Sequence, residues 1–586
     1  MSMETNYQPC NPEVWGGIEC TINRVGNCFR DQLTDAGHYE RLEDIAAIAS
    51  LGIKKLRYPV LWEKHQPLQD QPIDWSWTGR QLAALRKYNI TPIAGLLHHG
   101  SGPEYTSLQD DAFPEKLAAY ASLVAKQFPW LEYYTPVNEP LTTARFSGLY
   151  GFWYPHLKNE KQFVEMLLRQ VKATVLAMQA IRKINPNAKL VQTEDLAKVH
   201  STPLLAYQAA FENKRRWWTY DLLCGKFNRR HPAWAYFISL GIRPSSLVFF
   251  TDNHCTPEVL GFNYYATSER YLDQHLSKYP RHMHGGNGRH RYADIDAASQ
   301  GRSVGLEALL KEAWERYKLP MAITECHLNC TREEQMRWMH ETWTTCCSLL
   351  QQGITIKAFT AWSLFGSHDW DSLLLKQNNH YESGVFDLSQ GYLRPTILAE
   401  MIRAMSQGQS YNHPLLQEKG WWAKHQQPAT KQAAARPLLA IDLAGGITAF
   451  EQVCAIRKIR LELFDCVQDA EDCSRRLNEY VIREDPWAVM ITIGSNTEEE
   501  YNLCRCIESF CLQHAIPLLL AVTTPEQLMQ FTDKNEHTLI VQNDGADGMK
   551  LADKALDLLI DGETGIWCAG QTGVLKFDTA NLELYS

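Results

Sequence analysis

Short apolar runs alternate with longer segments of helical periodicity from residue 13 to about residue 400. Eight of these runs are apolar at their start and polar or aromatic at their end, and we expect a β-strand in each: 13–20, 54–62, 91–99, 133–140, 189–196, 259–266, 320–328 and 356–365. Between them, apolar residues recur at i, i+3, i+4 and i+7, which is typical of a helix with one buried face, in segments 38–52, 114–128, 160–184 and 332–352. Eight β-then-α units predict an α/β fold with a closed (β/α)8 TIM barrel.

The pattern changes after residue 424. Residues 425–437 are rich in Ala, Gln and Pro and have no apolar period, which indicates a linker. An apolar strand, a glycine turn and a helix follow in 437–459, and two further buried strands are predicted at 484–494 and 514–524. We therefore predict three parts: a barrel domain of residues 1–424, a linker of residues 425–437, and a small Rossmann-like α/β domain of residues 438–586.

Composition narrows the classes of protein that fit this chain. It has 586 residues, of which 45% are hydrophobic and 21% charged, and this ordinary globular composition excludes disordered, collagen-like and disulfide-scaffold proteins. The net charge of -9 has the wrong sign for a protein that holds phosphate backbones, so we expect no nucleic-acid partner. No run approaches the ~20 apolar residues of a membrane helix, and the N-terminus lacks a signal-peptide pattern, so we expect a cytoplasmic protein without membrane contact.

The sequence does not indicate a metal or cofactor site. The pairs Cys346-Cys347 and Cys504/Cys506 lack the paired CxxC spacing of a zinc site. The Gly-, His- and Arg-rich segment 281–292 is predicted to be a loop on the barrel rim with solvated histidines. We therefore expect neither a metal nor a cofactor.

Two glutamates stand directly after apolar runs. Glu139 ends the fourth predicted strand and Glu325 ends the seventh. Because barrels of this kind carry their chemistry at the C-terminal ends of the strands, we expect both carboxyl groups at the barrel mouth. Two carboxyl groups that face each other across a pocket are the minimum for glycoside hydrolysis, where one protonates the leaving oxygen and the other attacks the anomeric carbon or activates water. The alternative is that each glutamate is an ion-pair partner in the rim.

The segments around these two residues resemble a known family. TPVNEP at 135–140 and ITE at 323–325 look like the acid/base and nucleophile motifs of glycoside hydrolase family 1, the β-glucosidase family, and the resemblance extends over most of residues 13–405. It implies a retaining β-glycosidase that works by double displacement, with Glu139 as acid/base and Glu325 as nucleophile. The substrate contacts that it implies are Arg57, His98, Asn138, Asn263, Tyr265 and Trp362.

The resemblance also implies a task for several of these side chains. Arg57 would hold the carboxylate of Glu325 ionised, and the Tyr265 hydroxyl would donate a further hydrogen bond to it. Asn138 would bond the sugar 2-hydroxyl, and Trp362 would offer a flat apolar face to the pyranose ring. These residues together predict a small carbohydrate as the substrate.

The chain departs from the family at three places. Asn23 stands where the family has Gln, His99 where it has Trp, and Asp369-Trp370 where it has Glu-Trp. These changes fall on groups that would hold the sugar and leave the reacting pair intact, so we expect a small or modified β-glycoside as substrate. The alternative is a carbohydrate-binding pseudoenzyme whose altered sugar site supports no turnover.

The second domain resembles a shortened dTDP-4-dehydrorhamnose reductase of the extended short-chain dehydrogenase type. Leu443, Gly446 and Ala449 fall on the three positions of that family's glycine fingerprint, and only one of them is glycine. Neither Tyr480 nor Tyr501 has a Lys four residues later, as the family's catalytic pair requires. We expect a non-catalytic remnant that packs on the barrel or mediates homo-oligomer formation. A sugar-nucleotide reductase is the third and least supported hypothesis.

Overall fold

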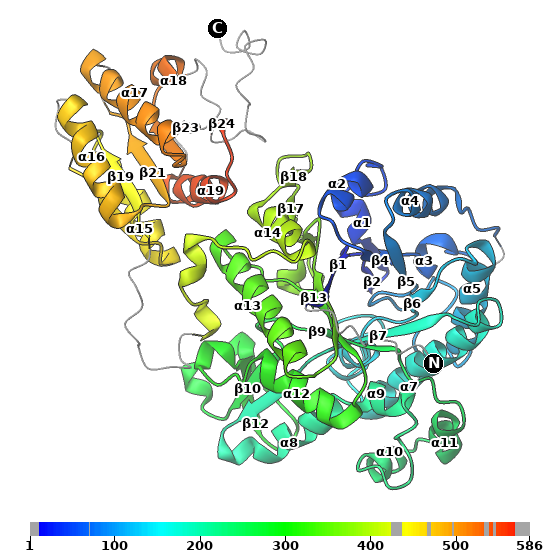
Figure 1. The fold of residues 1–586 in the computed structure, drawn as a ribbon. Helices are drawn as coiled ribbons and strands as arrows, with labels where there is room; N and C mark the ends of the chain where they lie inside the picture. Colours follow the sequence, from blue (N-terminus) through cyan, green and yellow to red (C-terminus); the bar gives the residue numbers. More distant parts are fainter. Residues whose placement is uncertain are drawn as a thin grey trace, which may run out of the picture.

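The computed structural model describes residues 11–69, 71–423, 436–465, 470–494, 497–531, 538–542 and 547–568. Figure 1 shows two lobes: a large lobe of strands surrounded by helices, and a small lobe, coloured yellow to red, that contains the C-terminal elements. The predicted linker, 425–437, falls outside the described residues except for its last two positions.

The large lobe is built on eight strands: β1 (Glu13–Gly17), β4 (Lys55–Pro59), β5 (Thr91–Gly95), β6 (Tyr133–Thr135), β7 (Lys189–Asp195), β9 (Val259–Asn263), β13 (Met321–Cys326) and β14 (Ile356–Ala361). They are parallel and close into a barrel in the order β1-β14-β13-β9-β7-β6-β5-β4. Each of the eight predicted runs contains one of these strands, so the prediction of a (β/α)8 barrel is confirmed. Inside the barrel, one buried cluster joins six strands through Trp15, Ile93, Val191, Val259, Ala322 and Ala358.

Helices connect the strands and cover the outside of the barrel. The four predicted helical segments form α2 (Asp44–Ser50), α5 (Phe113–Gln127), α7 (Glu160–Arg182) and α13 (Arg332–Gln351). In α5, the buried residues Leu117, Tyr120, Ala121 and Val124 keep the i, i+3, i+4, i+7 spacing that predicts this helix. The other helices of this lobe are α1 (Gln32–Asp35), α3 (Trp62–His65), α4 (Ser76–Lys87), α6 (Pro140–Ala144), α8 (Ala206–Arg215), α9 (Trp218–Leu223), α10 (Trp234–Ser239), α11 (Pro244–Asp252), α12 (Leu306–Tyr317) and α14 (Ile397–Ser406).

Further strands lie on the segments that follow the barrel strands. They are β2 (Ile22–Val25), β3 (Cys28–Asp31), β8 (Lys198–Ser201), β10 (Glu269–Asp273), β11 (His284–Gly286), β12 (Arg291–Asp296), β15 (Ser367–His368), β16 (Tyr381–Glu382), β17 (Phe386–Asp387) and β18 (Arg394–Pro395). The prediction of a loop over 281–292 is wrong for part of this segment, because β11 pairs antiparallel with β12. The two strands are joined by residues 287–290, which begin with Asn-Gly, a dipeptide that favours hairpin turns.

The small lobe is built on a second parallel sheet. Its strands are β19 (Leu438–Asp442), β20 (Leu461–Leu463), β21 (Ala488–Thr492), β22 (Leu518–Val522), β23 (Thr538–Gln542) and β24 (Gly565–Cys568), in the order β20-β19-β21-β22-β23-β24. Its helices are α15 (Thr448–Arg457), α16 (Ala470–Glu484), α17 (Glu498–Gln513), α18 (Pro525–Phe531) and α19 (Gly548–Ile560). Strand β21 is buried along its whole length, as in a sheet that is covered on both faces. The predicted strand–helix alternation is present, while the Rossmann-like assignment stays a prediction.

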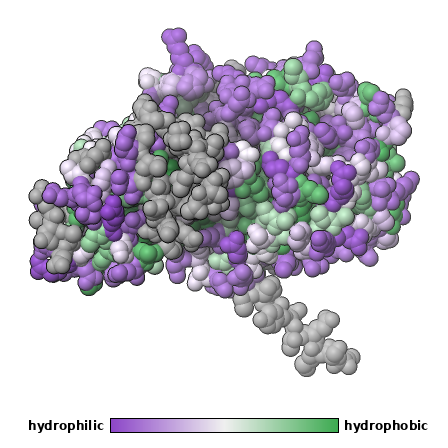
Figure 2. Space-filling model, turned by 90° about the horizontal axis from the view of Figure 1, so that it is seen from above, coloured by the Kyte–Doolittle hydropathy of each residue, from purple (hydrophilic) through white to green (hydrophobic). Residues whose placement is uncertain are grey.

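One hydrophobic core extends across both lobes, and the small lobe has a second buried cluster of its own. A single cluster of buried apolar side chains includes Met336 and Met401 of the barrel together with Phe450 and Leu556 of the small lobe. Helix α19 packs on α13, on the side of the barrel where Figure 1 shows the small lobe. The face of the molecule in Figure 2 is mostly hydrophilic, with hydrophobic residues in smaller groups. Within the described part of the chain, no helix is long and apolar enough to cross a membrane.

Candidate active site

Glu139 lies where the chain passes from strand β6 into a helix. It immediately precedes α6 (Pro140–Ala144), and its φ of 45° is a left-handed conformation that residues with a side chain rarely adopt. Its buried carboxyl group accepts a 2.6 Å hydrogen bond at Oε1 from Asn263 Nδ2, at the end of β9. Asn263 Oδ1 in turn accepts from Thr324 Oγ1 at 2.7 Å, which fixes the orientation of the amide. The turn therefore directs Glu139 toward β9 and β13.

Glu325 lies on β13 beside the same asparagine. The strand register shifts between Ile323 and Glu325 and places Glu325 opposite Asn263. Arg57 Nη1, from β4, lies 2.8 Å from Glu325 Oε1, and the Tyr265 hydroxyl donates a hydrogen bond to Glu325 Oε2. Each oxygen of this carboxylate therefore has a donor, which favours its ionised form.

Asn138, the residue before Glu139, contacts four polar side chains. Its Oδ1 accepts hydrogen bonds of 2.7 Å from Arg57 Nη2 and 2.7 Å from Thr193 Oγ1. Its Nδ2 lies 3.3 Å from His98 Nε2 and 3.2 Å from His99 Nε2. This network links the ends of β4, β5, β6 and β7, so the amide has one defined orientation.

Two tryptophans and two histidines form an aromatic wall beside the carboxyl groups. Trp362 stacks on His98 with ring centroids 5.4 Å apart, and the guanidinium of Arg57 lies 4.7 Å from the Trp362 ring centroid. Trp370 meets His99 edge-on at 5.7 Å between centroids. Burial lowers the pKa of His98 well below its ordinary value and that of His99 to about 3, so both rings are neutral at pH 7.

The two carboxyl groups have different electrostatic surroundings. The pKa of Glu139 is raised well above its ordinary value, first by burial and then by the negative charge of Glu325. Burial also raises the pKa of Glu325, but the charge of Arg57 and the hydrogen bond from Tyr265 act in the opposite direction. These surroundings favour a proton on Glu139 and a carboxylate at Glu325.

Two predicted sugar contacts, Asn23 and Asp369, have other surroundings in the structure. Asp369 Oδ2 lies 2.6 Å from Arg30 Nη2, and its Oδ1 accepts from the backbone N–H groups of Asn378 at 3.1 Å and His380 at 2.8 Å. Asn23 is opposite Arg30 in the β2–β3 hairpin, and its buried Nδ2 has no hydrogen-bond partner among the residues that the structure describes. The remaining predicted site residues contact one another, whereas Asp369 organises the loop that carries Trp370.

Glu19 is a third buried glutamate near the candidate site, and the sequence analysis missed it. It is buried two residues after β1, and its Oε1 accepts from the backbone N–H of Thr21 at 2.9 Å and from the Thr21 hydroxyl at 2.6 Å. Its own N–H donates to Ser363 Oγ, next to Trp362, at 3.0 Å. Burial raises the pKa of Glu19 to about 7, and the charge of Glu325 adds to the rise. The signal was available, because Glu19 follows an apolar strand as Glu139 and Glu325 do.

The small lobe carries an acidic side chain in the turn after its first strand. Asp442 Oδ1 accepts from the backbone N–H groups of Ala444 at 3.3 Å and Gly446 at 3.1 Å, and from the Thr492 hydroxyl. A dinucleotide site would need such N–H groups for the pyrophosphate, which a carboxylate repels. We therefore still predict that this lobe leaves NAD(P)H unbound. Among the described residues, no group of three or more His, Cys, Asp or Glu could hold a metal ion.

Comparisons with known proteins match the large lobe. The model of the family described as "Glycosyl hydrolase family 1" matches residues 20–377. A curated relative, the aryl-phospho-beta-D-glucosidase BglC of Bacillus subtilis (strain 168), is 22% identical over 380 residues, which span 57% of this chain and 78% of that protein.

Solved structures show the same fold as the large lobe. The family 1 β-glucosidase from Thermotoga maritima is 15% identical with a TM-score of 0.56, and the match covers 69% of this chain and 99% of that chain. The AHE enzyme from Alicyclobacillus herbarius is 16% identical with a TM-score of 0.54, and the match covers 64% of this chain and 88% of that chain. At these identities the structural matches establish the fold alone.

Proposed function

The chain belongs to glycosyl hydrolase family 1 and is a glycoside hydrolase, and from this membership we propose that its barrel hydrolyses small β-glycosides with retention of configuration. In the first step, Glu139 gives its proton to the leaving oxygen while Glu325 attacks the anomeric carbon and forms a glycosyl-enzyme. In the second step, Glu139 takes a proton from water, whose oxygen displaces Glu325 from the same carbon.

The unequal environment of the two carboxyl groups is the observation that carries this proposal. Glu325 has Arg57 on one oxygen and the Tyr265 hydroxyl on the other, as a carboxylate nucleophile needs. Glu139 is buried beside the charge of Glu325, and its Oε1 accepts a hydrogen bond from the neutral amide of Asn263. A general acid needs such a raised pKa to keep its proton near neutral pH.

The charges around the pair favour a glycone without a phosphate group. The relative from Bacillus subtilis is named an aryl-phospho-beta-D-glucosidase. In this chain, the buried Glu325 at the end of a barrel strand is the carboxyl group proposed to be ionised, and the two neighbouring histidines are neutral. Arg57 is already engaged by Glu325 and Asn138. Because like charges repel strongly in a buried site, we propose an unphosphorylated sugar as the substrate.

A panel of aryl β-glycosides tests this function. We expect turnover of at least one unphosphorylated glycoside and none of its 6-phospho counterpart. Proton NMR during the first minutes should show the β-anomer of the free sugar as the first product, since two displacements retain the configuration. The α-anomer as first product would contradict the double displacement. Sugar binding by calorimetry without any turnover would instead support the pseudoenzyme.

Tyr265→Phe should move the acid limb of the pH profile of kcat/KM to higher pH. The Tyr265 hydrogen bond lowers the pKa of Glu325, so its removal raises that pKa and delays ionisation of the nucleophile as pH rises. The alkaline limb reports the deprotonation of Glu139 and should stay close to its wild-type position. Steady-state rates measured at intervals of ~1 pH unit between about pH 4 and pH 10 would locate both limbs of the profile.

Tyr264→Phe is the matched control for this variant. Tyr264 is the neighbouring buried tyrosine, and its hydroxyl bonds Glu269 at 3.3 Å rather than Glu325. Its loss should leave both limbs unchanged. A Tyr265→Phe profile that shifts only on the alkaline side would contradict the assignment of Glu325 as the ionised partner.

A further inference from the structure

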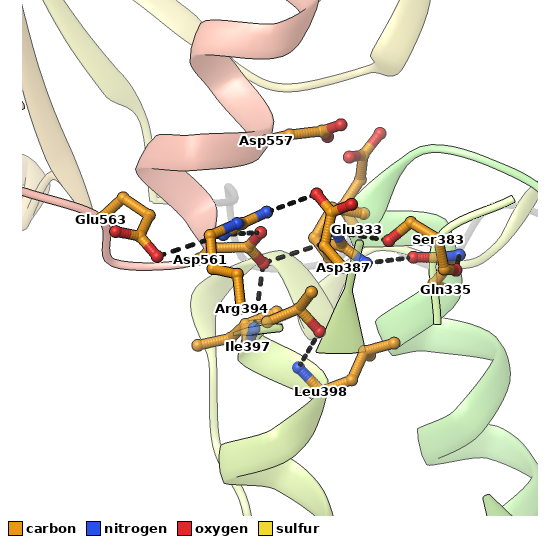
Figure 3. A network of polar contacts seen from close by, with 12 residues as sticks. Glu333, Gln335, Ser383, Asp387, Arg394, Ile397, Leu398, Asp557, Asp561 and Glu563 are labelled. Carbon is orange, nitrogen blue, oxygen red and sulfur yellow. Dashed lines mark hydrogen bonds and ion pairs between the residues drawn. The ribbon is translucent and has the colours of Figure 1, made fainter. Parts of the chain in front are cut away.

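A buried ion network joins the small lobe to the barrel (Figure 3). Asp561 follows α19 directly, and the exposed fraction of its side chain is 0%. Arg332, the first residue of α13, places Nε 2.9 Å from Asp561 Oδ1. Arg394 of β18 places Nη1 3.0 Å from Oδ2, and Figure 3 shows Arg394 next to Asp561. The N–H of Ile397 also donates to Oδ1 at 2.9 Å. A carboxylate at the C-terminal end of a helix is disfavoured by the helix dipole, so the two arginines compensate this position.

Arg332 extends the network from the small lobe to the segment that follows the proposed nucleophile. Its Nη1 donates to Gln335 Oε1 at 2.6 Å, and Gln335 Nε2 donates to the carbonyl of Leu328 at 3.1 Å. Leu328 lies three residues after Glu325. Gln335, whose side chain Arg332 orients, therefore holds the middle of the loop between β13 and α13.

The same two side chains hold the loop that follows β14. Arg332 Nη2 donates to Ser383 Oγ at 3.0 Å, and Gln335 Nε2 donates to the carbonyl of Ser383 at 2.9 Å. The neighbouring Glu382 lies in β16, which pairs with β15 and so closes the loop that carries Trp370. His327 Nε2 lies 3.3 Å from Glu382 Oε2 and ties this loop to the one after β13.

We infer that Asp561 of the small lobe is a positioning residue for the reaction in the barrel. It holds Arg332, and Arg332 with Gln335 holds the two loops, 326–331 and 366–384, that flank the site. This inference rests on the proposed function. The small lobe thereby takes part in the reaction without touching the substrate.

Removal of the Asp561 charge has a defined physical consequence. The side chain of Arg332 has an exposed fraction of only 3%, so without Asp561 its guanidinium is a buried, uncompensated charge. It would turn toward other acceptors and release Ser383 and Gln335. The two loops would then sample more conformations, and displacements of ~1 Å near reacting atoms can slow a reaction strongly.

Lys554 provides a matched control at the same interface. It lies in α19, seven residues before Asp561, and its Nζ is 3.3 Å from Asp387 Oδ2 and 3.5 Å from Ser389 Oγ. Its contacts join the small lobe to the barrel but do not reach either loop. Lys554→Gln therefore removes an ion pair between the lobes and leaves the path through Arg332 intact.

Hydrogen exchange followed by mass spectrometry tests the inference without any substrate. In Asp561→Asn, peptides covering 326–331 and 366–384 should exchange faster than in the wild type. In Lys554→Gln, they should exchange as in the wild type. Unchanged exchange of both loops in a folded Asp561→Asn would overturn the inference, even if no glycoside were ever turned over.

Kinetics provide the second readout, on the glycoside that the wild type hydrolyses. Per folded molecule, Asp561→Asn should lower kcat/KM about tenfold or more, and Lys554→Gln should leave it unchanged. A purely structural role would lower the melting temperature and leave kcat and KM as they are, which would count against the inference. An active wild type with an unaffected Asp561→Asn would leave the proposed glycosidase in place and refute only the positioning role.

Ser383→Ala serves if Asp561→Asn does not fold. This variant removes one acceptor of Arg332 within the barrel and leaves the interface between the lobes untouched. It should speed exchange of 366–384 and lower kcat/KM in the same direction. Where both variants fold, their effects on kcat/KM should be less than additive, because they break one chain of contacts, and strict additivity would contradict the inference.

Discussion

Glu325→Gln should lower the turnover of aryl β-glycosides by roughly four orders of magnitude or more, because the amide cannot form the covalent glycosyl-enzyme. The amide keeps the shape of the carboxylate, and Arg57 keeps its bonds to Asn138 and to the carbonyl of Thr324. We therefore expect the variant to fold, with a melting temperature close to that of the wild type. Initial rates on an activated aryl glycoside, together with a thermal melt, would measure both quantities.

Glu19→Gln is the control for this experiment. It removes another buried carboxyl group, whose pKa the charge of Glu325 also raises and whose Oε1 accepts hydrogen bonds from Thr21. Turnover should stay within about tenfold of the wild type, because this group forms no bond to the sugar in the proposed mechanism. Wild-type activity in Glu325→Gln would show that the nucleophile has been assigned wrongly.

Glu139→Gln should slow glycosides with poor leaving groups by about a thousandfold or more and activated aryl glycosides far less. A poor leaving group departs only with the proton that Glu139 supplies, whereas a nitrophenolate needs little protonation in the first step. A plot of log kcat/KM against the leaving-group pKa should therefore be much steeper for Glu139→Gln than for the wild type. A series of substituted phenyl β-glycosides would provide this slope.

The two glutamine variants are most informative as a pair. Glu325→Gln should lose activity on every leaving group to a similar extent, while the loss in Glu139→Gln should depend on the leaving group. Equal, leaving-group-independent losses in both variants would contradict the two roles. The lower pKa expected for Glu139 once the charge of Glu325 is gone is a further signature, because Glu325 contributes to its rise.

The barrel could be predicted from the sequence because its signal is local and repeated. Each barrel strand is an apolar run that ends in polar residues, and α5 shows its buried stripe through Leu117, Tyr120 and Val124. The hairpin of β11 and β12 was missed, although Asn287-Gly288 is a turn signal, because the Gly- and His-rich run around it has low strand propensity.

The candidate site residues that lie at the ends of barrel strands could be predicted from the sequence. Glu139, Glu325, Arg57 and Asn263 come together because parallel strands end at the same rim of the barrel. The partner of Asp369 could not be found in this way, because Arg30 is 339 positions away and lies on a rim hairpin. No local pattern in the sequence records such a contact.

The burial of the polar first turn of α13 could not be predicted from the sequence either. Residues 332–335, REEQ, have the composition of a solvated first turn, yet all four are buried. The small lobe covers the first two: Arg332 pairs with Asp561, and Glu333 lies 2.5 Å from Arg457 Nη2. Gln335 is held by Leu328 and Ser383 of the barrel lobe. Burial by a second lobe leaves no trace in helical periodicity, so the interface could not be read from the sequence.

The hydrophobic core that continues from the barrel into the small lobe affects how the protein unfolds. A barrel cut off after residue 424 would expose Met336 and Met401 and leave Arg332 without its partner. The truncated barrel would lose both the burial of these apolar side chains and the compensation of the Arg332 charge. Because each lobe stabilises the other in this way, we expect the two lobes to unfold in one cooperative transition rather than two. A destabilising mutation in α19 would then lower the rate of hydrolysis by lowering the amount of folded enzyme.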